Sequence, residues 1–183
     1  MGGDALVYSR KNVGVLGMND SEDAVLLEYS KFPWLVFKVD ETKYAVNSKA
    51  ITGILPLPQT VTSIPTSPKY IKGIIRARGE VITLIELRTL FLIQPSNNQY
   101  EQMVVSLQDN ELHIGIIVDS VIGVENINYL YKHNDIQNLC TGDYIIGVGN
   151  TEKDDDLILL VSDNKLTNKV REAEIDISED QIV

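Results

Sequence analysis

Two arginines beside a predicted turn are the residues best placed for chemistry. Arg76 and Arg78 are separated by one residue, and Gly79 and Glu80 follow directly. Side chains alternate along a strand, so both guanidinium groups project from one face if this segment is extended. Glycine favours a tight reversal because it adopts a positive φ readily. The spacing therefore predicts a cluster of positive charge on one strand face, next to a turn.

The residue types that enzymes use are present, but no catalytic pattern connects them. The chain has two histidines, His113 and His133, and one cysteine, Cys140, without metal-ligand spacing. The run from Asp154 to Asp156 lacks the glycine and the terminal glutamate of a calcium loop. The sequence therefore predicts no catalytic residues, no metal and no cofactor. A small β-barrel hydrolase using Asp119, His113 and His133 is an alternative, and it requires these groups to converge in one pocket.

Composition limits the other function classes. The 183 residues carry a formal net charge of −10, with 26 acidic and 16 basic side chains. This balance disfavours a nucleic-acid binder of the OB or SH3 type, which is a further alternative. From Thr151 to Val183, ten acidic residues stand against four basic ones. A single cysteine excludes an internal disulfide, and no run approaches the ~20 apolar residues of a membrane helix. We expect a cytoplasmic protein.

The elements that position these residues are predominantly strands. Apolar runs rich in β-branched residues alternate with short turns, which is the pattern of β-hairpins. Four hairpins are predicted: Trp34–Val39 with Tyr44–Val46, Ile71–Ala77 with Val81–Leu87, Met103–Leu107 with Leu112–Val118, and Tyr144–Val148 with Leu157–Val161. Val121–Val124 is predicted as a further strand, Glu86–Phe91 as a helical turn, Asn164–Glu174 as a helix, and residues 126–142 as irregular. About eight to ten short strands favour small barrels or a sandwich.

The same patterns suggest how the chain is divided. Residues 1–31 are a weakly patterned extension, 32–168 form the folded domain, and 169–183 form an acidic tail. A polar loop at residues 94–102 is the expected boundary between two lobes. Four isoleucines are assigned to the core: Ile71, Ile75, Ile85 and Ile117.

The segment from Ser63 to Arg88 resembles the signature of a known family. From Pro68 it reads Pro-Lys-Tyr-Ile-Lys-Gly-Ile-Ile-Arg-Ala-Arg-Gly-Glu-Val-Ile-Thr-Leu-Ile-Glu-Leu-Arg, which is similar to the CheW family of chemotaxis coupling proteins. Further stretches match in the same order: Leu35–Phe37 with Tyr44–Val46, Ile114–Val121, Tyr144–Val148 and Leu157–Leu166. The resemblance covers about residues 32–168. Arg76-Ala77 stands where the family usually has Asn-Leu, and Thr83 and Glu86 also depart from the usual Pro and Asp.

The resemblance implies an all-β fold with minor helices, in which two SH3-like five-stranded β-barrel lobes form one domain. The last strands are expected to return to the first lobe. It also implies an adaptor without catalysis that binds the regulatory domain of a CheA-type histidine kinase and the cytoplasmic tip of methyl-accepting chemoreceptors. Such tips are helical hairpins, so an apolar groove is expected to accept a helix. The protein would reach receptor arrays at the membrane through these partners, without inserting and without binding nucleic acid.

Contact residues follow from motif position. The resemblance implies that Arg78 is the residue most associated with receptor coupling, and Gly79 is expected to form the turn beside it. Arg76, Ile51, Arg88 and Asp119 are the further candidates for receptor or kinase binding. The competing interpretation for Arg78 is an arginine that braces the turn through hydrogen bonds to local carbonyl groups. For Ile51 it is core packing, and for Asp119 it is bracing of a turn. An adaptor of a histidine-kinase pathway outside chemotaxis is the alternative function.

Overall fold

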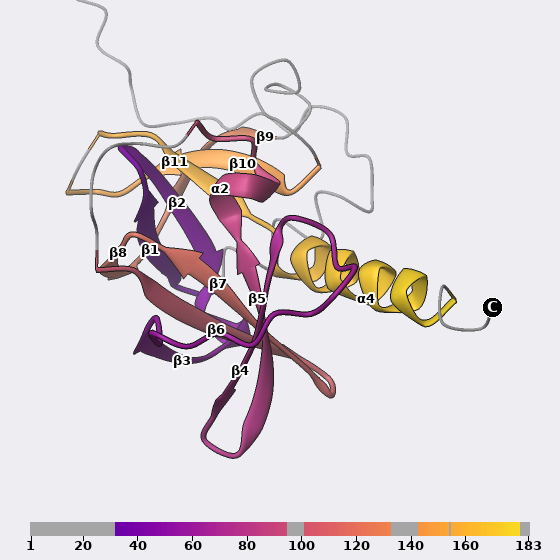
Figure 1. Ribbon diagram of the computed structural model, residues 1–183. Coiled ribbons are helices and arrows are strands. Elements are labelled where there is room, and N and C mark those ends of the chain that lie inside the picture. Colours follow the sequence, from indigo (N-terminus) through magenta and orange to yellow (C-terminus); the bar gives the residue numbers. More distant parts are fainter. Residues whose placement is uncertain (1–31, 95–100, 133–142, 154, 180–183) are drawn as a thin grey trace, which may run out of the picture. The chain divides into compact units, whose positions relative to one another are not determined.

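The computed structural model describes residues 32–94, 101–132, 143–153 and 155–179 (Figure 1). Its strands are β1 (Trp34–Val39), β2 (Thr42–Asn47), β3 (Ile51–Pro56), β4 (Ile71–Ala77), β5 (Glu80–Glu86), β6 (Met103–Asp109), β7 (Leu112–Val118), β8 (Ser120–Glu125), β9 (Asn128–Lys132), β10 (Ile145–Asn150) and β11 (Ile158–Val161). The helices are η1 (Ser48–Ala50), α2 (Leu87–Leu90) and α4 (Asp163–Glu179). His133, Cys140, Asp154, the extension at 1–31 and most of the predicted lobe boundary lie outside the described residues.

The strands form two sheets. One has six strands in the order β8-β1-β2-β11-β10-β9, and the other has five in the order β3-β6-β7-β5-β4. All neighbours are antiparallel except β2 with β11 and β5 with β7. The predicted β-rich fold with two lobes and minor helices is confirmed, as are the four hairpins. Five strands were expected in each lobe, but one lobe has six. Both sheets keep edge strands within the described residues, so neither is a closed barrel.

One predicted irregular segment was wrong. Residues 126–142 include β9, which pairs antiparallel with β10 from Asn150 and Asn128 onward. Tyr129 and Tyr131 of this strand are residues that favour strands, but the mostly polar residues on either side, from Glu125 to Asn128 and from Lys132 to Asn138, hide this short signal. Pairing with β10 supplies the backbone hydrogen bonds of this strand.

The main hydrophobic core joins the two sheets. Phe37 and Val46 come from the six-stranded sheet, and Ile85 and Ile116 come from the five-stranded sheet. A second cluster lies within the five-stranded sheet and contains Ile75, Ile82, Leu84, Val104 and Ile117. The four isoleucines predicted for the core, Ile71, Ile75, Ile85 and Ile117, are all buried, which confirms that assignment.

The β4–β5 hairpin turns at Arg78 and Gly79. Both residues have positive φ values, +54° and +89°, which are those of a type I′ turn. This turn matches the right-handed twist of the strands that it connects. Figure 1 shows the hairpin projecting from the sheet, with its turn at the far end. The predicted reversal at Gly79 is therefore present, and Arg78 shares its unusual backbone conformation.

Helix α4 is anchored to the core by Leu166 and Val170, which are fully buried. The hydroxyl of Tyr70 donates a hydrogen bond to the carbonyl oxygen of Lys169, at 3.4 Å. A hydrogen bond with Glu172 raises the pKa of Lys169, and burial raises the pKa of Tyr144 nearby. The helix continues to Glu179, so the acidic tail expected from residue 169 begins inside a helix.

Candidate functional site

A groove of about 520 Å³ opens between β3 and the β4–β5 hairpin. Its floor includes the apolar side chains of Leu55, Ala77 and Ile82, which belong to or pack on the second core cluster. Its remaining lining residues are Thr52, Gly53, Arg78, Glu80, Ser106, Gln108 and His113. We call this cavity the Arg78 groove. An apolar floor with a charged and polar rim is the usual anatomy of a protein contact site.

Arg78 combines an exposed side chain with a strained backbone. Its φ of +54° is left-handed, a region that costs a residue with a Cβ atom about 1–2 kcal/mol. Nη1 of its guanidinium donates a hydrogen bond to the carbonyl oxygen of Thr52 in β3, at 3.2 Å. The hairpin turn is therefore linked to the opposite wall of the groove.

Ser106 lies at the same groove. The residue is only 5% exposed, and its hydroxyl has no hydrogen-bond partner among the described residues. At the rim, Nε2 of His113 lies 3.6 Å from Oε2 of Glu80. Strained backbone conformations tend to occur at functional sites, and the left-handed Arg78 lines the same groove as Ser106.

Replacing Arg78 by asparagine is expected to stabilise the protein. Asn-Gly is the preferred pair of a type I′ turn, so Arg78→Asn should add about 1 kcal/mol to the free energy of unfolding. Thermal unfolding should show a Tm higher by about 2–4 °C in a protein of this size. Arg76→Asn is the matched control, because it removes the same charge from an exposed residue of β4 with ordinary backbone geometry. An unchanged Tm for Arg78→Asn would show that the turn is not strained.

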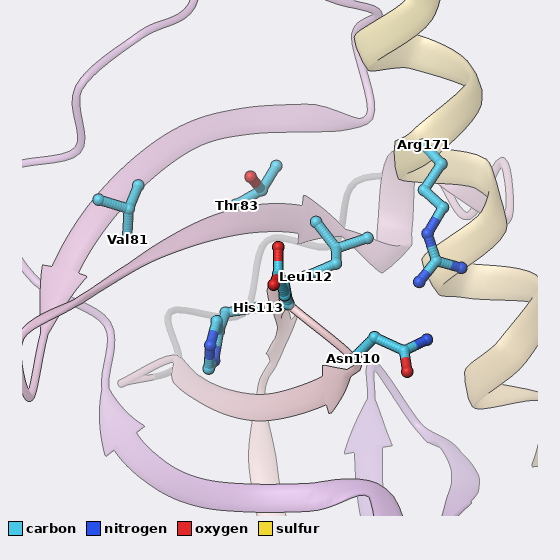
Figure 2. Close-up of a pocket in the computed structure, with 7 residues that line it drawn as sticks. Val81, Thr83, Asn110, Leu112, His113 and Arg171 are labelled. Atoms are coloured by element: carbon cyan, nitrogen blue, oxygen red, sulfur yellow. The ribbon is translucent and has the colours of Figure 1, made fainter.

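A second cavity, of about 740 Å³, is bounded by β5, the β6–β7 turn and α4 (Figure 2). It is lined by Val81, Thr83, Asn110, Glu111, Leu112, His113 and Arg171. Figure 2 shows Arg171 extending from α4 toward the turn that carries Asn110. Nη2 of Arg171 donates to Oδ2 of Asp109 at 2.8 Å, so this arginine fastens α4 to the turn. His113 lines both cavities.

A comparison with known protein families identifies the family of this domain. The model of the family described as CheW-like domain matches residues 33–171. The chain belongs to the CheW-like domain family. This match includes both sheets and the first half of α4, and all the residues that line the Arg78 groove lie within it.

Curated relatives and one solved structure agree with this CheW-like assignment. The chain is 30% identical over 91 residues to the chemotaxis protein CheW of Klebsiella aerogenes, covering 50% of this chain and 54% of that protein. It is 26% identical over 97 residues to the chemotaxis protein CheW of Thermotoga maritima, covering 53% and 63% respectively. These matches span little more than half of the length of the curated relatives. The crystal structure of the scaffolding protein TtCheW from Thermoanaerobacter tengcongensis has the same fold, with a TM-score of 0.58 at 22% identity, covering 71% of this chain and 88% of that one.

The CheW-like domain separates the six expected contact residues into different environments. Arg78 and Gly79 form the turn at the groove, and Arg76 is exposed on β4 but lines neither cavity. Ile51 is half-buried and packs on the main core, although its neighbour Thr52 accepts the hydrogen bond from Arg78. Of the six residues, Arg76, Arg78 and Gly79 lie together on the β4–β5 hairpin.

Arg88 and Asp119 lie in an internal cluster with Asp40, which we call the Asp119 cluster. Nη2 of Arg88 donates a short hydrogen bond to Oδ2 of Asp119, whose side chain is 2% exposed. The same oxygen accepts a hydrogen bond from the backbone N–H of Asp40, at 2.6 Å. Asp40 is in the β1–β2 turn of one sheet, and Arg88 is in α2 after β5 of the other. The cluster therefore ties the two lobes together.

The hydrolase alternative finds no support in this arrangement. Asp119 is held by Arg88 and lines neither cavity, whereas His113 is at the groove rim beside Glu80. Within the described ranges, no three side chains of His, Cys, Asp or Glu are grouped to hold a metal ion. None of the helices in the described part of the chain combines the length and hydrophobicity needed to traverse a bilayer.

Gly53 and Ser106 are groove residues that the sequence did not reveal. Gly53 interrupts a run of apolar and β-branched residues in β3, and a glycine inside a strand often marks a close approach of another group. That signal was available in the sequence, but nothing in it pointed to Arg78. Ser106 is a polar residue inside the otherwise apolar run Met103–Leu107 of β6, and this interruption was the available signal.

Proposed function

We propose that this chain is a non-enzymatic signalling adaptor that couples chemoreceptors to a CheA-type histidine kinase in bacterial chemotaxis. The observation that carries the proposal is the Arg78 groove in a CheW-like domain, where a left-handed arginine stands at the edge of an apolar floor. This backbone conformation does not stabilise the isolated protein. It is expected of a surface that is completed by a partner.

The partner assigned to the groove is the cytoplasmic tip of a chemoreceptor. A helical hairpin offers apolar side chains at intervals of three and four residues, which suit the floor formed by Leu55, Ala77 and Ile82. Arg78 at the rim would fix the orientation of the helix through its charge. The regulatory domain of the kinase is assigned to another part of the surface, because an adaptor holds both partners at once. We place the assembly in the cytoplasm, at the membrane only through the receptor.

Reversing the charge of Arg78 tests this function. Calorimetric titration would measure binding of the protein to two probes from the same genome: a receptor-tip fragment and the regulatory domain of the kinase. Arg78→Glu is expected to weaken binding to the tip at least ~10-fold, because an acidic group then faces the contact. Lys72→Glu is the matched control, since Lys72 is an exposed cation of β4 that does not line the groove.

Three outcomes separate the parts of the proposal. Loss of tip binding by Arg78→Glu alone supports both the function and the site. Equal binding of both probes by wild type and Arg78→Glu removes Arg78 from its assigned role. Failure of the wild-type protein to bind either probe removes the adaptor function.

A further inference from the structure

The guanidinium of Arg78 lies against the single glycine of β3. A Cβ atom on residue 53 would stand 2.9 Å from Nη1, 3.3 Å from Cζ and 3.4 Å from Nη2 of Arg78. Any side chain at this position would therefore displace the guanidinium. We propose that Gly53 is a positioning residue, which seats the Arg78 guanidinium across β3 so that it receives a carboxylate of the partner. The proposal rests on the proposed function, because it concerns the same groove.

The backbone of β3 does not itself require glycine at this position. The glycines with positive φ among the described residues are Gly73, Gly79 and Gly123, so Gly53 has a conformation open to other residues. Glycine weakens the interior of a strand because it loses the most entropy and packs nothing. The close approach of Arg78 is the feature that excludes a side chain here.

A bulge in β3 supplies the acceptor for the same guanidinium. Ile51 pairs with Leu107 and Gly53 pairs with Ser106, so Thr52 is the extra residue between two regular pairs. The extra residue of a bulge is left outside the regular ladder. The carbonyl oxygen of Thr52 accepts the 3.2 Å hydrogen bond from Nη1 of Arg78. The bulge at Thr52 and the glycine at position 53 together form a site that holds the planar guanidinium of Arg78, and we call this site the seat.

The Arg78 guanidinium has no acidic partner among the residues that the structure describes. No ion pair joins Arg78 to a carboxylate in the described part of the chain, and the nearby Glu80 lies 3.6 Å from His113 instead. A guanidinium has five N–H donors in a fixed plane and pairs best with a carboxylate. With Nη1 donating to Thr52, other donors remain for an aspartate or glutamate on a helix in the groove.

Gly53→Ala tests the seat while leaving Arg78 in place. The atoms that the new methyl group meets are the end of a flexible side chain, so the guanidinium moves aside and the fold is kept. We expect a Tm equal to or above that of the wild type. Binding of the receptor-tip fragment should weaken by about fivefold to tenfold, because the guanidinium is no longer held where it meets the carboxylate of the partner.

A double-mutant cycle isolates the positioning effect. In an Arg78→Ala background, adding Gly53→Ala should change binding less than about twofold, because no guanidinium is left to position. If Arg78→Ala weakens binding but Gly53→Ala does not, the seat is overturned and the proposed function stands. Additive losses would also overturn it, since they would mean that Gly53 acts independently of Arg78.

A readout without any partner keeps the inference testable if the adaptor function fails. Nitrogen-15 NMR of arginine side chains should give separate Nη signals for Arg78 in the wild type, because the hydrogen bond to Thr52 slows rotation of the group. In Gly53→Ala these signals should merge. Equal signals in both proteins would overturn the seat.

The carboxylate is tested from the partner's side. Each aspartate and glutamate of the receptor-tip fragment is replaced in turn by its amide. One replacement is expected to weaken binding to the wild type about as much as Arg78→Ala does, and to have no further effect on Arg78→Ala. If no amide variant couples to Arg78, the assigned ligand chemistry is wrong.

Discussion

Asp119→Ala is expected to lower the free energy of unfolding by about 3–5 kcal/mol, the usual result of breaking a buried ion pair from one side. Arg88, whose side chain is 16% exposed, would keep only the more distant carboxylate of Asp40, 3.9 Å from its Nη1, as a counter-ion. The backbone N–H of Asp40 would lose its acceptor at the same time. Urea denaturation should report this loss, and the Tm should fall by about 2–4 °C per kcal/mol.

Asp156→Ala is the matched control for this prediction. Asp156 pairs with Nζ of Lys43 at 2.8 Å, but its side chain is 68% exposed. An exposed ion pair contributes about 0–1 kcal/mol, so this variant should unfold nearly as the wild type does. Equal effects of the two substitutions would show that the Asp119 cluster does not hold the lobes together.

Gly73→Ala is expected to lower the free energy of unfolding by at least ~3 kcal/mol, from backbone strain and lost hydrogen bonds together. Gly73 has a φ of +140°, and a Cβ atom there would stand 2.3 Å from the carbonyl oxygen of Thr62. Thr62 and Ile74 exchange backbone hydrogen bonds of 3.0 and 2.8 Å. A methyl group would push this pairing apart and uncover the second core cluster beneath the loop.

Gly79→Ala separates the two causes of that loss. Gly79 also has a positive φ, +89°, but no atom lies within 4 Å of the position of its added Cβ. In this variant the free energy of unfolding should fall only by the cost of a positive φ for a residue with a Cβ atom, about 1 kcal/mol. Chemical denaturation of both variants gives the difference directly. A Gly73→Ala protein as stable as Gly79→Ala would mean that the loop does not depend on close approach.

Much of the fold was predictable because its hairpins are local. In each, two β-branched runs flank a short turn, and side-chain alternation then fixes which residues are buried. β9 was not predictable in this way, because its pairing with β10 joins segments on either side of residues 133–142. The parallel pairs, β2 with β11 and β5 with β7, join strands that are not neighbours in the sequence, so local patterns do not predict them either.

The candidate site was only partly predictable for the same reason. Arg78 and Gly79 could be placed at a turn from their neighbours alone. Thr52, which accepts the hydrogen bond from Arg78, is 26 positions away along the chain, and only the folding of the second sheet brings β3 opposite the turn. Arg88 is ten positions after Arg78 in the sequence, but α2 directs it to Asp119 and away from the groove.

The pairing of β2 with β11 has a consequence for synthesis of the protein. The five-stranded sheet is built from one continuous stretch, Ile51 to Val118, whereas the six-stranded sheet uses strands before and after that stretch. A ribosome therefore makes every strand of the five-stranded sheet before it has made Ile158–Val161, which joins β2 to β10. Contacts so distant along the chain form slowly. The six-stranded sheet is completed last, when all strands of the five-stranded sheet are already available to pair.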